Sequence, residues 1–217
     1  MESILRFLTD LDRNNNRDWF HAHQAEYLEA KKMFEDFTGK LILRIGQFDS
    51  RIRGITAAGS IFRIHRDTRF SNDKTPYKPN FGAHLSRGGK NSGDPGYYLH
   101  IQPGECFVSA GIYMPPSDKL KRIRKEIVNF PEDFKSLIGD PYFIKELSLF
   151  QDGKLKRPPV GFPADSDLIE YLKLKHYCPW MPVPDIRMSS PDLLDFIVDK
   201  YIRMKPFNDF IYRALED

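Results

Sequence analysis

Two periods of hydrophobic and polar positions follow one another along the chain and divide it into helical and strand-forming parts. Apolar side chains recur every three or four positions within residues 3–12 and 17–48, which predicts amphipathic helices. Apolar and polar positions alternate between residues 61–114, which predicts β-strands. Helical spacing returns in the C-terminal part, residues 117–217. Because no linker and no internal repeat interrupts this order, we predict one α+β domain over residues 1–217.

Residues that cap or break helices set the expected helix boundaries. Asn16 is the expected N-cap of the second helix, because its side chain can accept a hydrogen bond from a free backbone N–H group. A further helix is predicted over residues 117–128. Pro206 lacks a backbone N–H group, which predicts a break between one helix over 191–203 and another over 206–215.

Four strand-like runs lie within the alternating part of the chain. They are IFRIHRD (61–67), PNFGAHLS (79–86), YYLHIQP (97–103) and CFVSAGIYM (106–114). Turn residues between these runs favour antiparallel pairing, so we predict an antiparallel sheet of about four or more strands with helices on one face. The prolines of HYCPWMPVP (176–184) are typical of an irregular segment or an edge strand.

Alternation within these runs assigns the side chains to two faces of the predicted sheet. The first face is apolar and would carry the helices: Phe62, Ile64, Phe81, Ala83, Leu85, Tyr97, Leu99, Ile101, Val108, Ala110 and Ile112. The second face is mostly polar: Arg63, His65, Asp67, Asn80, Gly82, His84, Ser86, Tyr98, His100, Gln102, Phe107, Ser109, Gly111 and Tyr113. Small residues on the second face leave volume for a ligand, although the same pattern is typical of a face that is simply wet.

Composition adds a local concentration of positive charge to this picture. The net charge of the chain is only +3, yet residues 51–90 carry nine lysines and arginines against two acids, Asp67 and Asp73, a balance of +7. Such a stretch attracts anions. The small net charge does not by itself indicate a nucleic-acid-coating protein, and 41% hydrophobic with 29% charged residues is typical of a globular chain.

The centre of this concentration, residues 61–78, holds the candidate binding residues. Arg63, Arg66 and Arg69 recur every third position, and they would converge on one dianion if the chain turned after Asp67. Asp67 would orient one arginine, and as a candidate general base it would be weakened by the cations beside it. An internally neutralised ion-pair network that pins a loop is the competing explanation. The residues expected to hold an anion are Arg63, Arg66, Arg69, Lys74 and Lys78.

Aromatic rings and imidazoles complete the candidate site. Tyr77 and Tyr98 would supply stacking or hydroxyl groups, and His100 is the candidate acid–base residue because an ordinary imidazole titrates near neutrality. His65 and His84 share the polar face with His100, but their spacing matches no metal motif, so we predict no metal and no cofactor. The two cysteines lie far apart in the sequence and match no disulfide or zinc pattern.

Three segments carry motifs of a known family: NNNRDWF (14–20), RIHRDTRFSNDKTPYK (63–78) and YYLHIQPGECFVSAGIYMP (97–115). Together with the later RPPVGFP and KPFNDF they resemble an uncharacterised, mainly bacterial family of domain-of-unknown-function proteins with the signature RDxRFSxDKxPYK. The resemblance implies a single α+β domain and no established activity, cofactor or catalytic residue. The motif positions are Arg63, Arg66, Asp67, Arg69, Phe70, Asp73, Lys74, Pro76, Tyr77, Lys78 and His100.

Three functions stay open on these observations. The first is binding of a small anionic ligand, bearing phosphate or carboxylate, above the polar face of the sheet. The second is binding of single-stranded nucleic acid, with Phe70, Tyr77 or Tyr98 stacked on bases. The third is a non-catalytic scaffold or interaction module. No stretch is apolar enough to span a membrane and no signal peptide is recognisable, so we expect a cytoplasmic protein; enzymatic activity and oligomeric state are not predicted.

Overall fold

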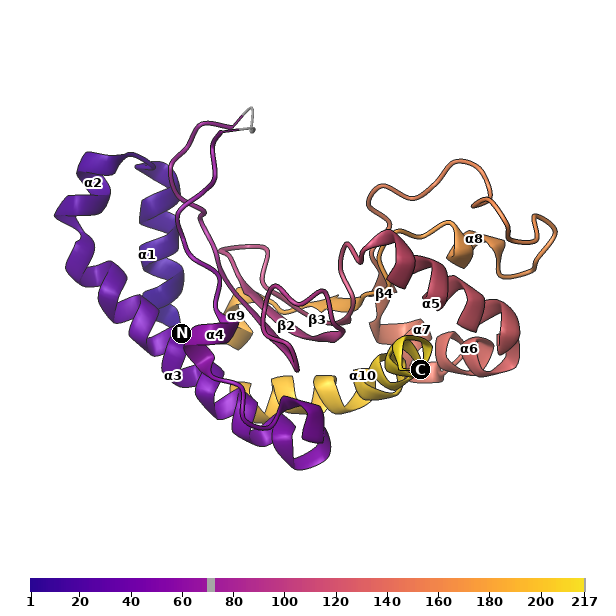
Figure 1. Ribbon diagram of the computed structural model, residues 1–217. Helices are drawn as coiled ribbons and strands as arrows, with labels where there is room; N and C mark the ends of the chain where they lie inside the picture. Colours follow the sequence, from indigo (N-terminus) through magenta and orange to yellow (C-terminus); the bar gives the residue numbers. More distant parts are fainter. Residues whose placement is uncertain (70–72, 217) are drawn as a thin grey trace.

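A five-stranded antiparallel sheet lies between two groups of helices in the computed structural model, which describes residues 1–69 and 73–216 (Figure 1). The strands are β1 (Phe81–Ser86), β2 (Gly96–Ile101), β3 (Phe107–Gly111), β4 (Ser148–Leu149) and β5 (Pro179–Pro182). Their order across the sheet is β1-β2-β3-β5-β4, and each neighbouring pair is antiparallel. The predicted α+β fold is confirmed.

The N-terminal group of helices precedes the sheet. It contains α1 (Glu2–Arg13), α2 (Arg17–Ala22), α3 (Gln24–Phe48), the 3₁₀ helix η1 (Ser50–Ile52) and α4 (Ala57–Ser60). Asn16 caps α2 as predicted, because its Oδ1 accepts a hydrogen bond from the backbone N–H of Trp19 at 2.9 Å. The single helix predicted over 17–48 is wrong in one respect: the chain leaves helical geometry at His23 (φ −108°, ψ 24°). The imidazole of His23 stacks on Trp19, with centroids 4.0 Å apart, and stabilises this break.

The remaining helices follow β3. They are α5 (Ser117–Asn129), α6 (Pro131–Ile138), α7 (Pro141–Glu146), α8 (Ile169–Leu172), α9 (Asp185–Met188) and α10 (Leu193–Leu215). Helix α10 is continuous through Pro206, so the predicted break is wrong. Pro206 cannot donate to the carbonyl of Ile202, but Ile202 is exposed and water can bind that carbonyl, while residues on both sides of the proline are buried. No helix in the described ranges is long and apolar enough to cross a membrane.

The first predicted strand, residues 61–67, is not a regular strand, in contrast to the other three runs. It makes a single bridge to the sheet edge, between Ile61 and Ala83. Beyond this bridge the chain turns back on itself, and the N–H of Lys78 donates to the carbonyl of Ile64 at 2.9 Å. The segment therefore rises from the edge of the sheet as a loop that pairs with itself (Figure 1).

Strand β5 is an interior strand, although its prolines predicted an irregular segment or an edge strand. It pairs with β3 on one side and with the two-residue strand β4 on the other. Pro179 and Pro182 occupy its two ends, so only the terminal positions of the strand lack a donor. The carbonyl of Pro179 accepts a hydrogen bond from Ser109 Oγ at 2.8 Å, which ties β5 to β3.

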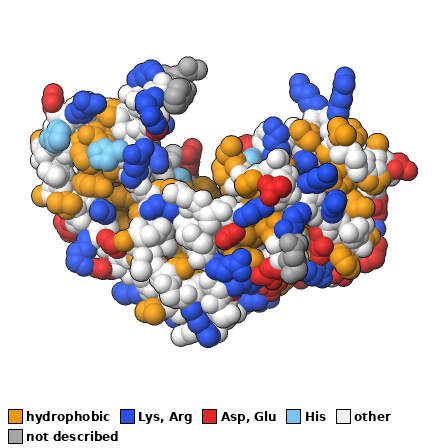
Figure 2. All heavy atoms as spheres, viewed as in Figure 1, with side chains coloured by type: hydrophobic (Ala, Val, Ile, Leu, Met, Phe, Trp, Pro, Cys, Tyr) orange, Lys and Arg blue, Asp and Glu red, His pale blue; other side chains and the backbone are white. Residues whose placement is uncertain are grey.

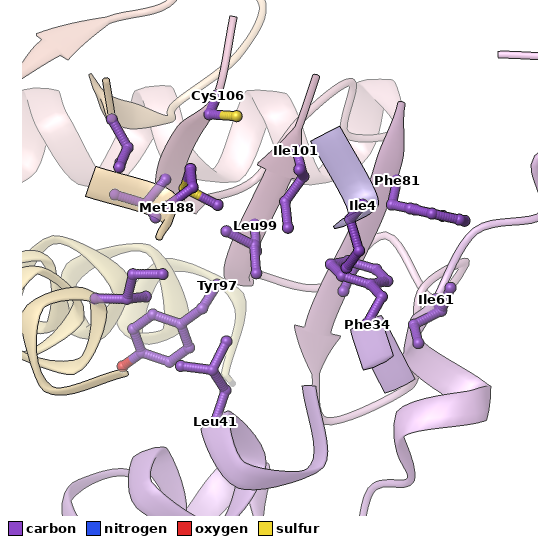
Figure 3. Packing of buried hydrophobic residues seen from close by; sticks show 14 of the residues in the cluster. Ile4, Phe34, Leu41, Ile61, Phe81, Tyr97, Leu99, Ile101, Cys106 and Met188 are labelled. Carbon is purple, nitrogen blue, oxygen red and sulfur yellow. The ribbon is translucent and has the colours of Figure 1, made fainter. Parts of the chain in front are cut away.

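The apolar face of the sheet packs against α1, α3 and α10, as predicted. Figure 3 shows Ile4 of α1 and Phe34 of α3 beside Phe81 and Leu99 of the sheet. Helix α10 continues from this cluster into a second one, which it shares with α5, α6 and α8. One long helix thus connects both cores on the same side of the sheet, and the polar face lies on the opposite side.

Candidate functional site

A cavity of about 660 Å³ lies over the polar face of the sheet, in the hollow between the two groups of helices (Figure 2). Its floor comes from His84, Tyr98, His100, Phe107 and Ser109. Its walls come from Phe62, Lys78 and Asn80 on one side and from Tyr113, Met114, Phe150 and Asp152 on the other. This volume is within the usual range of ligand pockets. The polar face is therefore the floor of a pocket and not a uniformly wet surface.

Tyr98 has room on this floor because Gly82 stands on the neighbouring strand. The register of β1 and β2 pairs Gly82 with His100 and His84 with Tyr98. A Cβ atom on Gly82 would lie 2.5 Å from Tyr98 Oη, so the hydroxyl occupies the place of a side chain. Phe62 contacts the same ring in an edge-to-face arrangement, with centroids 6.4 Å apart, so its predicted place on the apolar face is wrong. The tyrosine is held between the strand and the wall.

A chain of hydrogen bonds crosses the floor from Tyr98 to Glu105. Gln102 Nε2 donates to Glu105 Oε2 at 2.6 Å, which turns the amide oxygen toward His100 Nε2 at 3.3 Å. His100 Nε2 must carry the proton, because an amide oxygen only accepts. His100 Nδ1 is then bare and accepts from the Tyr98 hydroxyl at 3.1 Å. Because the single proton of the Tyr98 hydroxyl is donated to His100, Tyr98 Oη can take part in a further hydrogen bond only as an acceptor.

Burial sets the protonation states of these two side chains. It lowers the pKa of His100 below that of a free imidazole, against the hydrogen bond to Gln102, which acts in the opposite direction. It also raises the pKa of Tyr98 to about 12. Near pH 7 His100 is therefore neutral and Tyr98 is protonated, which are the states that their hydrogen bond requires.

Aromatic side chains line the cavity beside this chain of hydrogen bonds. Phe107 stacks on His100 with centroids 4.6 Å apart and planes 17° apart. Phe150, which follows β4, contacts Phe107 at 5.8 Å and stacks on Trp180 of β5 at 5.4 Å. The imidazole of His100 thus has one apolar side and one polar edge, an environment that keeps the ring orientation fixed.

The bend that ends β3 and begins the second wall depends on Gly111. Its φ is +98°, and a Cβ atom there would lie 1.9 Å from the carbonyl oxygen of Tyr177. Its N–H donates to Oδ1 of the buried Asn208 at 2.7 Å, and Asn208 Nδ2 donates to the carbonyl of Gly96 at 3.0 Å. Beyond the bend Met114 has φ +47°, a conformation uncommon for a residue with a side chain. Asn208 of α10, on the apolar side of the sheet, therefore helps to shape the rim of the cavity.

Lys78 brings positive charge to the first wall. Its Nζ donates to the backbone carbonyl of Arg63 at 3.2 Å and lies 5.9 Å from the centroid of Phe62. Burial lowers the pKa of Lys78, and the positive charges of Arg63 and Arg66 lower it further. No carboxylate of the described residues forms an ion pair with Lys78. Lys78 therefore lines the cavity without a carboxylate partner among the described residues.

Of the other charged groups that line the cavity, Lys90 and Asp94 are held by partners within the chain. Lys90 Nζ donates to the carbonyl of Ile61 at 2.6 Å and so ties the loop between β1 and β2 to the edge of the sheet. Asp94 pairs with Lys119 of α5 at 2.9 Å. Of the two lysines that line the cavity, Lys78 thus has fewer partners within the described chain.

The basic loop (residues 63–78) directs most of its charge away from the cavity. Arg69 pairs with Asp67 at 2.7 Å, and Arg66 pairs with Asp73 at 2.9 Å. Neither pair lines the cavity. Hydrogen bonds from Arg69 hold the pKa of Asp67 far below its ordinary range, which makes this carboxylate a weak base. The competing explanation, an ion-pair network that holds the loop, accounts for these two pairs.

The other predicted site residues divide between the loop, the core and the cavity. Lys74 Nζ donates to the carbonyl of Thr68 at 2.9 Å, away from the cavity. Tyr77 is only 3% exposed and stacks on Phe20 at 3.9 Å, so it belongs to the core. Arg63 is exposed beside Lys78. Phe70 lies outside the described residues. The predicted site residues that the cavity brings together are Lys78, Tyr98 and His100.

The three histidines of the predicted polar face do not meet. His65 packs against Phe20 and Tyr77, and His84 Nδ1 lies 3.4 Å from the carbonyl of Lys90. Within residues 1–69 and 73–216, no group of three or more His, Cys, Asp or Glu could hold a metal ion.

Sequence reasoning missed several contributors to the cavity. Phe107 was assigned to the correct face by alternation, but nothing local marked it as the ring that stacks on His100. Phe150 and Asp152 come from a turn-rich segment about forty residues further on, and no local pattern could have placed them beside the sheet. The basic-residue count included Lys90, although only the fold shows that it faces the cavity.

Comparison with known proteins identifies the family of this chain. The model of a family described as "Conserved hypothetical protein (DUF2461)" matches residues 3–210. A search of curated proteins found no match, and a search of solved structures found none either. The predicted membership in an uncharacterised family is confirmed over nearly the whole sequence. The chain belongs to the conserved hypothetical protein family DUF2461.

Proposed function

We propose that the protein binds a small anionic ligand, bearing phosphate or carboxylate, in the cavity over the polar face of the sheet. The position of Lys78 carries the proposal: the residue lines the pocket, and its ammonium group forms no ion pair with a carboxylate of the described residues. A bound anion would supply that counter-charge. Arg63, exposed near Lys78 but outside the cavity lining, would add positive potential that favours an anion.

The surroundings of Lys78 strengthen its interaction with an anion. Phe62 and Tyr98 form an apolar wall next to it, and charges attract one another more strongly beside apolar surface than in bulk water. Arg66 contributes further positive potential, although its own ion pair lies in the loop. These groups favour an anion over a neutral or cationic ligand at this wall.

Calorimetric titration with a panel of phosphate monoesters and dicarboxylates tests this function. At least one compound is expected to bind, and Lys78→Met is expected to weaken its affinity by about tenfold or more, the usual loss for a hydrogen bond to a charged group. Lys74→Met is the matched control, since it removes the same charge from the same loop outside the cavity. Absence of binding, or equal losses in the two variants, would contradict the proposal.

Single-stranded nucleic acid is distinguished by the same titration. Oligonucleotide binding by the basic loop would weaken steeply with salt and would be reduced by Lys74→Met as much as by Lys78→Met. A scaffold without a ligand predicts a different result. Lys78→Met would then lower the melting temperature, whereas a residue kept for binding costs little stability when it is removed.

A further inference from the structure

Lys78 and Lys90 line the same cavity but are held in different ways. Lys90 Nζ donates to two backbone carbonyls, those of Ile61 at 2.6 Å and Ala58 at 3.4 Å. Lys78 Nζ has one such partner, the carbonyl of Arg63 at 3.2 Å. Because an ammonium group has three donor hydrogens, two of those on Lys78 are free to meet a ligand. Lys90 therefore stabilises the loop between β1 and β2, whereas Lys78 can still interact with a ligand.

Two arginines that lie outside the cavity lining, Arg63 and Arg66, act on Lys78 through their positive charges. Partial burial beside Phe62 disfavours its ammonium form, and the charges of Arg63 and Arg66 act in the same direction, so the pKa of Lys78 is lowered. A lysine beside other cations in an apolar pocket holds more of its neutral amine, which is the nucleophilic form. This combination is typical of lysines that attack carbonyl groups.

We propose that Lys78 is an amine nucleophile that forms a Schiff base with an anionic carbonyl compound in the cavity. The ligand class is an aldehyde or ketone that also bears phosphate or carboxylate. The inference rests on the proposed function, because the anionic group would bind beside Arg63 and bring the carbonyl carbon to Lys78 Nζ. It deepens that function by assigning Lys78 a covalent role in place of a purely electrostatic one.

The covalent step is a condensation that needs no further reagent. The lone pair of the neutral amine attacks the carbonyl carbon and forms the C–N bond, while the C=O π electrons move to oxygen. The two hydrogens of the amine then leave with that oxygen as water, and a C=N double bond remains. Before this step the ammonium form must lose a proton, which solvent can accept because Lys78 is only partly buried.

Groups from several elements face Lys78 across the cavity. They are His84 of β1, Tyr98 and His100 of β2, Lys90 and Asp94 of the connecting loop, and Asp152 after β4. Burial lowers the pKa of both His84 and His100, so both imidazoles are neutral near pH 7 and add no positive charge to the cavity. Asp94 is engaged by Lys119, and no described carboxylate contacts Lys78 to stabilise its charged form.

Reductive trapping tests the proposal without the natural ligand. Glyoxylate, an aldehyde that carries a carboxylate, is added with sodium cyanoborohydride, whose hydride converts an imine into a stable secondary amine. Peptide mass spectrometry then measures the labelling rate of each lysine. At pH 7 Lys78 is expected to be labelled several-fold faster than Lys74, an exposed lysine of the same loop. Equal rates at the two positions would overturn the Schiff base.

A pair of arginine variants tests the cause of the reactivity. Arg63→Gln is expected to slow labelling of Lys78 several-fold at pH 7 and much less at a pH where the amine is already neutral. Arg69→Gln removes the same charge from the same loop and is expected to leave the rate unchanged, because Arg69 is matched to Asp67. With acetaldehyde, which has no charge, labelling of Lys78 should again be slower in Arg63→Gln than in the wild type or in Arg69→Gln. Equal slowing by both variants would contradict the role of Arg63.

Lys78→Arg separates this inference from the proposed function. The substitution keeps the positive charge but removes the nucleophile, so it is expected to retain binding of the phosphate or dicarboxylate found by calorimetry and to lose the fast-labelling site. Anion binding together with unselective labelling in the wild type would refute the Schiff base alone. Absence of both would refute the proposed function as well.

Discussion

The cations of the outer basic loop and the cation that lines the cavity differ in whether a carboxylate is paired with them. In the loop, Arg66 and Arg69 are each matched to an aspartate of the same loop. Lys78, which ends the same loop and lines the cavity, has a backbone carbonyl as its partner and two arginines as neighbours. The number of cations in a segment therefore says little about which of them can bind a ligand. Neutralisation by neighbours decides that question.

Sequence separation explains the difference. Arg69 and Asp67 are two residues apart, so their pairing orders little additional chain, and such pairs form wherever local charges alternate in sign. The cavity combines residues from β1, β2, β3 and the segment after β4. Whether a charge is matched there depends on which distant segment packs opposite to it. An unmatched charge in the cavity is for this reason more informative than several charges in the loop.

The largest loss of stability is expected from a substitution at Gly111, where the floor of the cavity meets its rim. In Gly111→Ala the new Cβ would lie 1.9 Å from the Tyr177 carbonyl oxygen at a φ of +98°. We expect the free energy of unfolding to fall by about 4 kcal/mol, from steric overlap and backbone strain together. Gly161→Ala is the control, since φ is +82° there with no atom near the new Cβ, and we expect a loss of about 1–2 kcal/mol. Urea denaturation measures both, and equal losses would refute the role of Tyr177.

A smaller effect is expected at Gly82, inside the floor. Gly82→Ala would place a Cβ 2.5 Å from Tyr98 Oη and push the hydroxyl away from His100, at a cost of about 1–2 kcal/mol. In a Tyr98→Phe background the same substitution should cost less, because the crowded atom is gone. Nitrogen chemical shifts of His100 would report loss of the Nδ1 hydrogen bond. Additive losses in the double variant would show that the two residues do not meet.

Removal of one cation from each region contrasts them directly. Arg66→Met breaks the ion pair with Asp73 and should lower the free energy of unfolding by about 1 kcal/mol. Lys78→Met removes a cation that has no carboxylate partner among the described residues, so stability should stay unchanged or increase. Thermal unfolding measures both variants. If Lys78→Met proves the more destabilising, its charge belongs to the structural network after all.

The smallest effect concerns pH and the buried imidazole of the floor. Because the pKa of His100 is lower in the folded state, the unfolded chain binds a proton first when the pH falls below about 6.5. The contribution of His100 to stability is thus fully present above that pH and is lost between it and the lower folded pKa. His100→Gln should reduce the loss, and the exposed His21→Gln should not. Urea denaturation across this range measures the slopes, and identical slopes in all three proteins would contradict the prediction.

Much of the fold could be predicted because its signals are local. Alternation placed three of the four predicted strands and assigned Leu99 and His100 to opposite faces correctly. The cap at Asn16 follows from its own side chain. Pro206 is the instructive failure: a local rule predicts a helix break, but burial of α10 in two cores outweighs one missing hydrogen bond.

The candidate site, like the fold, could be predicted where its signals are local and not where they depend on packing. The residue order alone established the polar face, the segment rich in positive charge and the candidates Lys78, Tyr98 and His100, since these follow from residue type and the two-residue period of a strand. Only the packed chain decided that Tyr77 is core, that Arg66 and Arg69 are paired with aspartates, and that Phe150 lines a pocket together with His100. Burial and ion pairing depend on distances between remote segments, and no local pattern encodes those distances.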